Sequence, residues 1–277
     1  MPAPAARVAR VRTAERAAGP APSQDRTVVL PTAVAVLDGA SAPDPGERDG
    51  GWYAGQLAGQ LAARLADSSL DLATVLADSI AAVTSRHRLR PGSSPSSTVA
   101  MLRWTEEQTE GLVLGDSSLV AFAAGGAVEE VVDDRLAAVA PAQRVAYQDR
   151  LAEGTGYDDE HLSLLRRLAG EQRRHRNSPG GYWIAEAEPA AARHALTRSW
   201  PAGALDAAVL ATDGVTRGVG HPGLPTWSAT LDLAAASGPA AVLDAVRAAE
   251  DADPDGRRWP RSKRHDDQSL VVVTWAL

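Results

Sequence analysis

Short apolar runs, many rich in valine and alanine, recur along the chain and are typical of β-strands. They lie at residues 6–13, 27–30, 33–37, 99–104, 111–114, 119–123, 128–132, 181–184, 208–212 and 269–275. Pro31 and Thr32 separate two of these runs and predict a hairpin turn. Turn-forming residues also follow several of the others, including the sequence Pro43, Asp44, Pro45 and Gly46, which predicts a loop.

A different spacing predicts helices from residue 51 and from residue 72. The leucines of the first and the apolar residues of the second recur every three or four positions. They are Leu57, Leu61 and Leu65, then Leu72, Val75, Leu76, Ile80 and Val83. Residues 136–176 and 231–247 are mostly helical by the same reasoning. This order of strands and helices predicts an α+β fold with mainly antiparallel sheets.

Composition narrows the class of protein. The chain has 277 residues, 44% of them hydrophobic, which is enough for one large domain or two small ones. The motifs described below favour one domain over residues 1–277. A net charge of −7 argues against a nucleic-acid or membrane-surface partner. The absence of cysteine excludes disulfides, thiolate metal sites and cysteine nucleophiles. No apolar stretch is long enough for a signal or a membrane helix, which predicts a cytoplasmic location.

Aspartates end or precede four of the predicted strands. They are Asp38, Asp116, Asp213 and the pair Asp266–Asp267. A single Asp-Gly after a strand is usually only a turn. Four such carboxylates converging on one rim would repel one another unless cations lay between them. Oxygen ligands of this kind suit Mg²⁺ or Mn²⁺, so the pattern predicts a divalent-metal site.

In their order along the chain, these motifs resemble the metal-dependent protein phosphatase family, the type 2C serine/threonine phosphatases, of the bacterial single-domain kind. The motifs are Ser23-Gln24-Asp25, Leu37-Asp38-Gly39, Gly115-Asp116-Ser117, Ala211-Thr212-Asp213-Gly214 and Asp266-Asp267-Gln268-Ser269. Ser96-Ser97-Thr98 is similar to a further family segment. The resemblance implies a four-layer α/β/β/α sandwich with the metals at one end of two central sheets.

The resemblance also implies roles for single residues. Asp38 would bridge two ions of Mn²⁺ or Mg²⁺, with the Gly39 carbonyl and Asp25 on the second ion and Asp213 and Asp266 on the first. Asp116 would belong to a third, weaker ion. The catalytic set would then be Asp38, Asp213 and Asp266. The implied reaction is hydrolysis of phosphoserine or phosphothreonine in a phosphorylated protein, by a metal-activated water and without a covalent enzyme intermediate.

Several positions depart from the family pattern. Ala40 stands where some members have a histidine, and Gln24 replaces the first acid of a pair. Pro20 replaces the phosphate-binding arginine, for which Arg16 or Arg26 would have to substitute. Arg217 replaces a carboxylate, so it would repel a third ion and could pair with Asp116 instead. We therefore expect two tightly bound ions.

Two functions stay open at this stage. The first is an active phosphatase; the second is a catalytically weak relative that binds phosphoproteins or other partners. Residues 135–180 lie where the family carries a flap, and their high charge fits a lid or a docking surface. The charge run 173–177 is typical of a solvated helix face. Tyr182 and Trp183 could line the cleft or belong to an ordinary strand.

Overall fold

Two five-stranded sheets form the centre of the computed structural model, which describes residues 8–40, 48–221 and 224–276. Sheet A holds, in spatial order, β1 (Val8–Arg16), β10 (Gln268–Ala276), β9 (Leu205–Ala211), β6 (Ser118–Ala123) and β7 (Val128–Val132). Sheet B holds β2 (Arg26–Leu30), β3 (Ala33–Leu37), β4 (Val99–Trp104), β5 (Gln108–Leu114) and β8 (Leu196–Pro201). Every neighbouring pair of strands is antiparallel.

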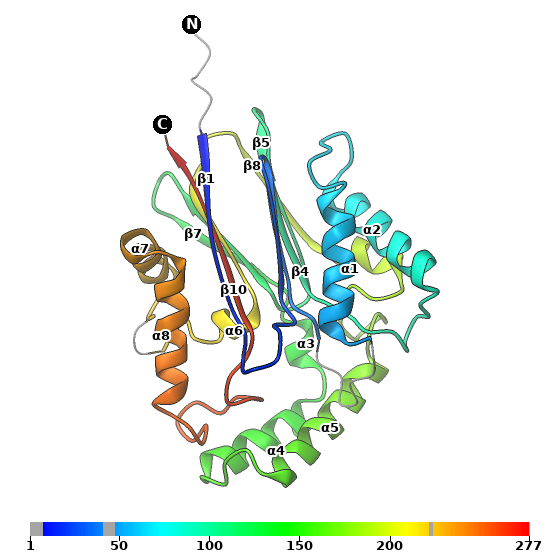
Figure 1. The fold of residues 1–277 in the computed structure, drawn as a ribbon, viewed down its shortest axis with the longest axis vertical. Helices are drawn as coiled ribbons and strands as arrows, with labels where there is room; N and C mark the ends of the chain where they lie inside the picture. Colours follow the sequence, from blue (N-terminus) through cyan, green and yellow to red (C-terminus); the bar gives the residue numbers. More distant parts are fainter. Residues whose placement is uncertain (1–7, 41–47, 222–223, 277) are drawn as a thin grey trace, which may run out of the picture.

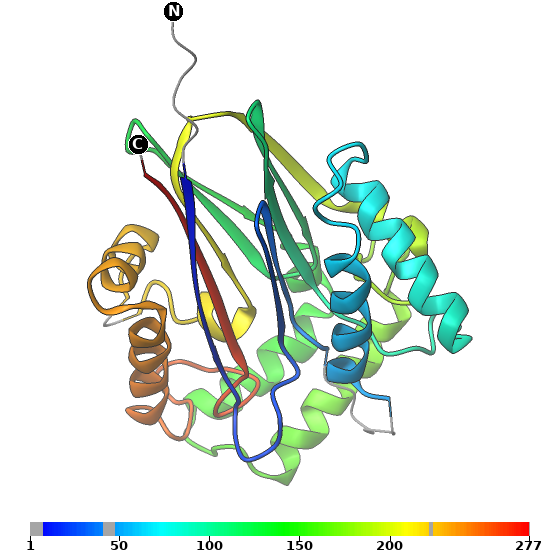
Figure 2. The same ribbon diagram turned by 45° about the horizontal axis from the view of Figure 1, so that its top comes forward.

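Helices cover the outer face of each sheet, so the molecule has four layers (Figure 1). The outer face of sheet B carries α1 (Gly50–Ala62) and α2 (Leu72–His87), and sheet A carries α7 (Trp227–Ser237) and α8 (Pro239–Asp251). Figure 2 shows the two sheets lying face to face between these helix pairs. The α+β class and the α/β/β/α sandwich predicted from the sequence are confirmed.

Burial on both faces explains why the central strands are continuously apolar. In β3, Val34 and Val36 contact the opposite sheet, whereas Ala35 and Leu37 contact α1 and α2. All five residues of this strand are fully buried. Side chains alternate across a strand, so a strand between two packed layers needs apolar residues at every position.

Three further helices lie across one end of the sandwich (Figure 1). They are α3 (Arg135–Ala138), α4 (Pro141–Ala152) and α5 (Asp159–Arg174), and we call them the end helices. Two short helical segments complete the described chain, a 3₁₀ helix at Pro189–His194 and α6 at Asp213–Thr216. No helix among the described residues is long and apolar enough to cross a membrane.

The structure departs from the predicted elements in a few places. The strand expected at 181–184 is wrong: Tyr182 makes only an isolated bridge, and the Ile184 amide donates to Asn177 Oδ1 at 2.9 Å. The sequence analysis missed β8. The helix expected at 231–247 is two helices, because Gly238 adopts a φ of 91° between α7 and α8. Ser41 and the loop predicted at 43–46 lie outside the described residues.

Candidate active site

The topology brings the predicted aspartates to the end of the sandwich that carries the end helices. Asp25 precedes β2 and Asp38 follows β3, and these strands pair with Arg26 opposite Leu37. Asp213 follows β9 and Asp266 precedes β10, and these strands pair with Leu270 opposite Ala211. Asp116 lies in the turn between β5 and β6. In antiparallel pairs the end of one strand meets the start of the next, so all five carboxylates gather at one rim.

The glycines beside these aspartates permit close approach of the protein's own backbone. A Cβ on Gly39 would lie 2.4 Å from the carbonyl carbon of Gly50 in α1. A Cβ on Gly214 would lie 1.9 Å from the carbonyl oxygen of Asp267. Gly39 therefore lets the end of β3 pack against α1, and Gly214 lets the segment after β9 pack against the residues before β10. This packing fixes the positions of Asp38 and Asp213 at the rim.

Buried hydroxyls hold the backbone around the carboxylates. Thr98 Oγ1 accepts from the Asp38 amide at 3.3 Å and lies 2.6 Å from Ser117 Oγ. Thr212 Oγ1 donates to Asp25 Oδ2 at 2.8 Å and accepts from the Ser269 amide at 2.9 Å. The other oxygen of Asp25 is buried and has no hydrogen-bond partner among the described residues. An unpaired buried carboxylate oxygen is a ready ligand for a cation.

The pKa values of three carboxyls reflect this crowding. Burial, followed by the charges of Asp213, Asp267 and Asp266, raises the pKa of Asp25 to about 8. Burial and then Asp213 raise the pKa of Asp116 to about 6, although Arg217 and Arg144 oppose the shift. Burial, then Asp213, Asp25 and Asp266, raises the pKa of Asp38 well above its ordinary value. The carboxylates thus lie close enough to repel one another, as the sequence predicts.

Two basic side chains lie among these acids. Arg217 forms ion pairs with Asp213 and, at 3.6 Å, with Asp266 Oδ2. Lys263 Nζ lies 2.7 Å from Asp266 Oδ1. Burial alone would lower the pKa of Arg217, but Asp213, Asp266 and Asp116 raise it above its ordinary value. The expected pairing of Arg217 with Asp116 is therefore replaced by pairing with Asp213 and Asp266, and Asp116 acts on it only through its charge.

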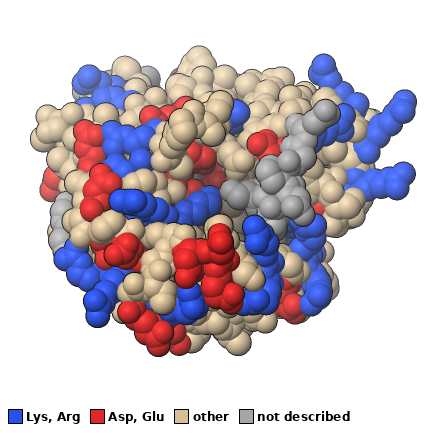
Figure 3. Space-filling model, turned by 60° about the horizontal axis from the view of Figure 1, so that its bottom comes forward, with Lys and Arg blue, Asp and Glu red and all other residues tan. Residues whose placement is uncertain are grey.

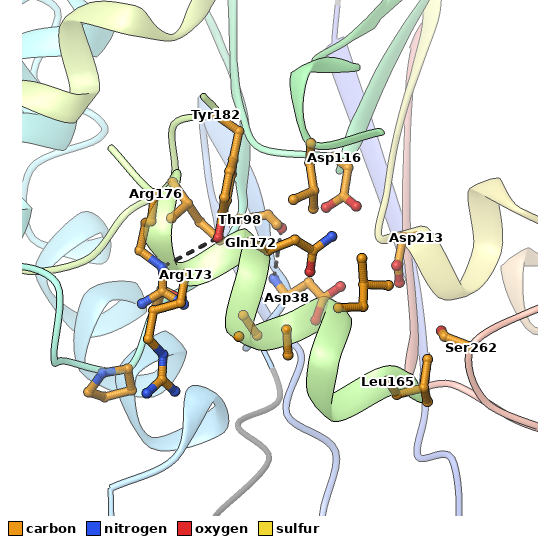
Figure 4. Close-up of a pocket in the computed structure, with 18 of the residues that line it drawn as sticks. Asp38, Thr98, Asp116, Leu165, Gln172, Arg173, Arg176, Tyr182, Asp213 and Ser262 are labelled. Atoms are coloured by element: carbon orange, nitrogen blue, oxygen red, sulfur yellow. Dashed lines mark hydrogen bonds between the residues drawn. The ribbon is translucent and has the colours of Figure 1, made fainter. Parts of the chain in front are cut away.

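A cleft of about 600 Å³ is lined by these acids and by a group of arginines. Asp38, Asp116, Asp213 and Asp266 line one side of it. The arginines that line it are Arg48, Arg144, Arg166, Arg173, Arg176 and Arg217. Figure 4 shows Asp38, Asp116 and Asp213 around the space into which Gln172 of α5 projects, with Arg173 and Arg176 beyond it. We call Arg144, Arg166 and Arg173, all on the end helices, the arginine wall.

The two arginines considered from the sequence as phosphate ligands point elsewhere. Arg16 ion-pairs with Asp244 of α8, and Arg26 donates to the carbonyls of Ser23 and Asp25. Neither lines the cleft. The arginine wall is freer: Arg144 Nη2 donates to the Leu136 carbonyl, and its buried Nε has no hydrogen-bond partner among the described residues. Sequence reasoning missed Arg144, because nothing in its local pattern shows which helix face turns toward the acids.

The charge run at 173–177 is only partly the solvated face that the sequence predicts. Arg173 is exposed, but the side chain of Arg176 is 13% exposed and pairs with the buried Glu186 at 3.2 Å. Tyr182 lines the cleft and lies within hydrogen-bond distance of Arg176. Over the outer face of the end helices, basic and acidic side chains are intermingled (Figure 3).

The carboxylates at the rim differ in how well they suit a hard divalent ion. Carboxylates that repel one another and a buried oxygen without a partner fit such an ion around Asp25 and Asp38. Asp213 and Asp266 fit it less well, because Arg217 and Lys263 already bind them. In the described part of the chain, no three His, Cys, Asp or Glu side chains come together as a complete metal cage.

Comparison with known proteins identifies the family. The family described as Protein phosphatase 2C matches residues 14–246. The chain belongs to the protein phosphatase 2C family. The resemblance found in the order of the aspartate motifs is thereby confirmed. No curated protein sequence matches the chain.

Solved structures agree on the fold of this phosphatase 2C chain. The catalytic domain of the serine/threonine protein phosphatase PstP, in complex with two manganese ions, is 15% identical with a TM-score of 0.58, covering 98% of this chain and 100% of that one. PstP/Ppp of Mycobacterium tuberculosis is 14% identical with a TM-score of 0.58, covering 96% and 98%. PppA of Pseudomonas aeruginosa is 18% identical with a TM-score of 0.57, covering 97% and 98%. These identities are low, so the likeness establishes the architecture alone.

Proposed function

We propose that this chain hydrolyses phosphoserine and phosphothreonine in proteins with the help of Mn²⁺ or Mg²⁺. One observation carries the proposal: four carboxylates from strand ends line the same cleft as the arginine wall. Divalent cations need the first group and a phosphoryl dianion needs the second. Their meeting in a phosphatase 2C fold supports phosphoric monoester hydrolysis over other reactions of acidic clefts.

The oxygen donors that would hold the cation are Asp25, Asp38 and the Gly39 carbonyl, with Asp213 and Asp266 beside them. When bound, the cation lowers the pKa of a water and offsets charge on the phosphoryl oxygens. The sequence-based expectation of two ions, with a weak third position at Asp116, stays a prediction. PstP, whose structure contains two manganese ions, gives a precedent for the metal but shares only 15% of residues with this chain.

The protein's own residues would position the substrate. Arg144 lines the same cleft as Asp116, and its charge lowers the pKa of that carboxyl. Its guanidinium would bind two phosphoryl oxygens, and Arg166 and Arg173 would contact the flanking phosphoprotein segment. Asp38 would hold the attacking water on the opposite side from the leaving oxygen. Ala40 offers no proton, so the leaving alkoxide would take its proton from solvent in the open cleft.

Hydrolysis of a phosphothreonine peptide and of para-nitrophenyl phosphate, with and without Mn²⁺, tests this function. We expect activity that requires the ion, disappears with EDTA and returns when Mn²⁺ is added in excess. Full activity in chelated protein would contradict the proposal. So would an Asp38→Asn variant that keeps wild-type activity.

A second candidate is a phosphatase-like binding module without turnover. The ion pairs of Arg217 with Asp213 and Asp266 favour it, because they neutralise carboxylates that the reaction would use. The two candidates differ in one measurement. A binding module would bind a phosphothreonine peptide in calorimetry and release no phosphate, whereas a phosphatase would release phosphate from the peptide.

A further inference from the structure

Four of the five carboxylates at the rim form two pairs, or halves, with different surroundings. Asp213 and Asp266 form one half, and both are bound by basic side chains. Asp25 and Asp38 form the other half, and in the described chain neither carboxylate has an ion pair at hydrogen-bond distance. Lys263 lowers the pKa of Asp38 through its charge and forms an ion pair with Asp266 at 2.7 Å.

Arg217 is held in place by the fold. It lies four residues after Asp213, so α6 places the two side chains on the same helical face. Its Nη1 lies 3.3 Å from Ser262 Oγ and 3.6 Å from Asp266 Oδ2. A guanidinium does not lose its proton near neutral pH, so its positive charge is permanent.

Both oxygens of Asp266 already have partners. Oδ1 accepts from Lys263 Nζ at 2.7 Å and from the Asp267 amide at 3.0 Å. Oδ2 lies next to Arg217. A metal ion at this half would have to displace Arg217 from two carboxylates and Lys263 from one. At the other half, the buried Oδ1 of Asp25 needs no such displacement.

We propose that Arg217 and Lys263 are built-in counter-cations of Asp213 and Asp266. The chain would then bind one divalent cation, at Asp25, Asp38 and the Gly39 carbonyl, in place of the two ions expected from the sequence. Charge balance points the same way. Arg217 and Lys263 offset the charges of Asp213 and Asp266. Asp25 and Asp38 would supply two further negative charges once an ion displaces their protons, and one divalent ion neutralises these. Mg²⁺ and Mn²⁺ commonly bind through one or two carboxylates with water completing the shell, so two carboxylates and a carbonyl suffice. The inference rests on the proposed metal chemistry of this site, not on turnover.

Counting bound Mn²⁺ tests the inference without an activity assay. Equilibrium dialysis followed by electron paramagnetic resonance of free Mn²⁺ gives the number of ions per chain for the wild-type protein. We expect one. Arg217→Gln removes the fixed charge and should create a second site, at least roughly tenfold tighter than any second binding by wild type. Arg150→Gln is the matched control, since it removes an arginine that pairs with Asp158 on the end helices.

A second readout is thermal stability. In EDTA, Arg217→Gln should have a lower Tm than wild type, because Asp213 and Asp266 lose a counter-charge. Saturating Mn²⁺ should raise the Tm of Arg217→Gln by more than it raises the Tm of Arg150→Gln. Two wild-type ions of similar affinity, or none, would overturn the inference, and so would an unchanged count in Arg217→Gln. Phosphatase activity with two ions per chain would refute this inference alone. One ion without any phosphate release would refute the proposed function alone.

Discussion

Glu186 is a buried carboxylate that ties Arg176 to the segment around Ser94. Its side chain is 1% exposed. Its carboxylate accepts from the Gly92 amide at 2.9 Å, from the Ser94 amide at 3.1 Å and from Arg176 Nη1 at 3.2 Å. Ser94 and Arg176 line the cleft. We predict that Glu186→Ala both destabilises the protein and loosens the part of the cleft lined by Ser94 and Arg176.

The magnitude follows from what the substitution leaves behind. Removing one partner of a buried ion pair costs about 3–5 kcal/mol, because the remaining charge is buried without compensation. Arg176 is 13% exposed, so solvent offsets only part of that cost, and two amides also lose their acceptor. For a domain of this size, each kcal/mol lowers Tm by about 2–4 °C, which gives a fall of about 6–20 °C.

Thermal unfolding followed by circular dichroism measures the effect, with Arg176→Met and the double variant completing a cycle. Because both residues act through one contact, the double variant should lose less stability than the sum of the single variants, by about 1–3 kcal/mol. A Tm within about 2 °C of wild type for Glu186→Ala, under 1 kcal/mol, would refute the reasoning. So would strictly additive effects.

Three other variants test the cleft itself. Asp38→Asn should lower kcat by about a hundredfold or more while the circular dichroism spectrum stays native, since it removes a charge without changing size; a loss below about twofold would exclude a role in the reaction. Arg144→Gln should raise KM for a phosphothreonine peptide by about tenfold, roughly 1.4 kcal/mol, whereas Arg150→Gln should leave KM unchanged. Burial raises the pKa of Asp25 from 3.8 to about 8. In EDTA, between about pH 4 and pH 8, the carboxyl is therefore protonated in the folded protein and ionised in the unfolded chain. The free energy of unfolding should fall as the pH rises through this range. Asp25→Asn should flatten this part of the Tm–pH curve, and an unchanged slope would count against the buried carboxyl as its source.

The strands and the five carboxylates could be predicted because their signals are local. Val99–Trp104 and Val128–Val132 form strands over the predicted bounds, since each is a short run with turn residues on both sides. Leu196–Pro201 was not predictable in this way. Its sequence is half polar, and its strand forms through pairing with the outer edge of β5. The strand propensity of these six residues gives no information about their pairing with β5.

The cations of the cleft were harder to predict than its acids, for a physical reason. Lys263 pairs with Asp266 three residues later, but its effect on Asp38 depends on the tertiary fold, because the two residues are far apart in sequence. The effect of Arg144 on Asp116 depends on the tertiary fold in the same way. Their positions depend on how the end helices and the loop before β10 pack, and single-sequence patterns carry no such information.

Arg217 is the instructive case, because its pairing with Asp213 depends on one local choice. As a turn, Ala211-Thr212-Asp213-Gly214 would leave the direction of Arg217 undetermined. In the structure Asp213 instead begins a helix, and the Thr216 amide donates to the Thr212 carbonyl at 3.1 Å. Gly214 makes this possible by packing against the Asp267 carbonyl, where a side chain would collide. Helical geometry then brings residue 217 over residue 213. The glycine that reads as a turn signal is thus what lets a permanent cation lie against a carboxylate at the centre of the cleft.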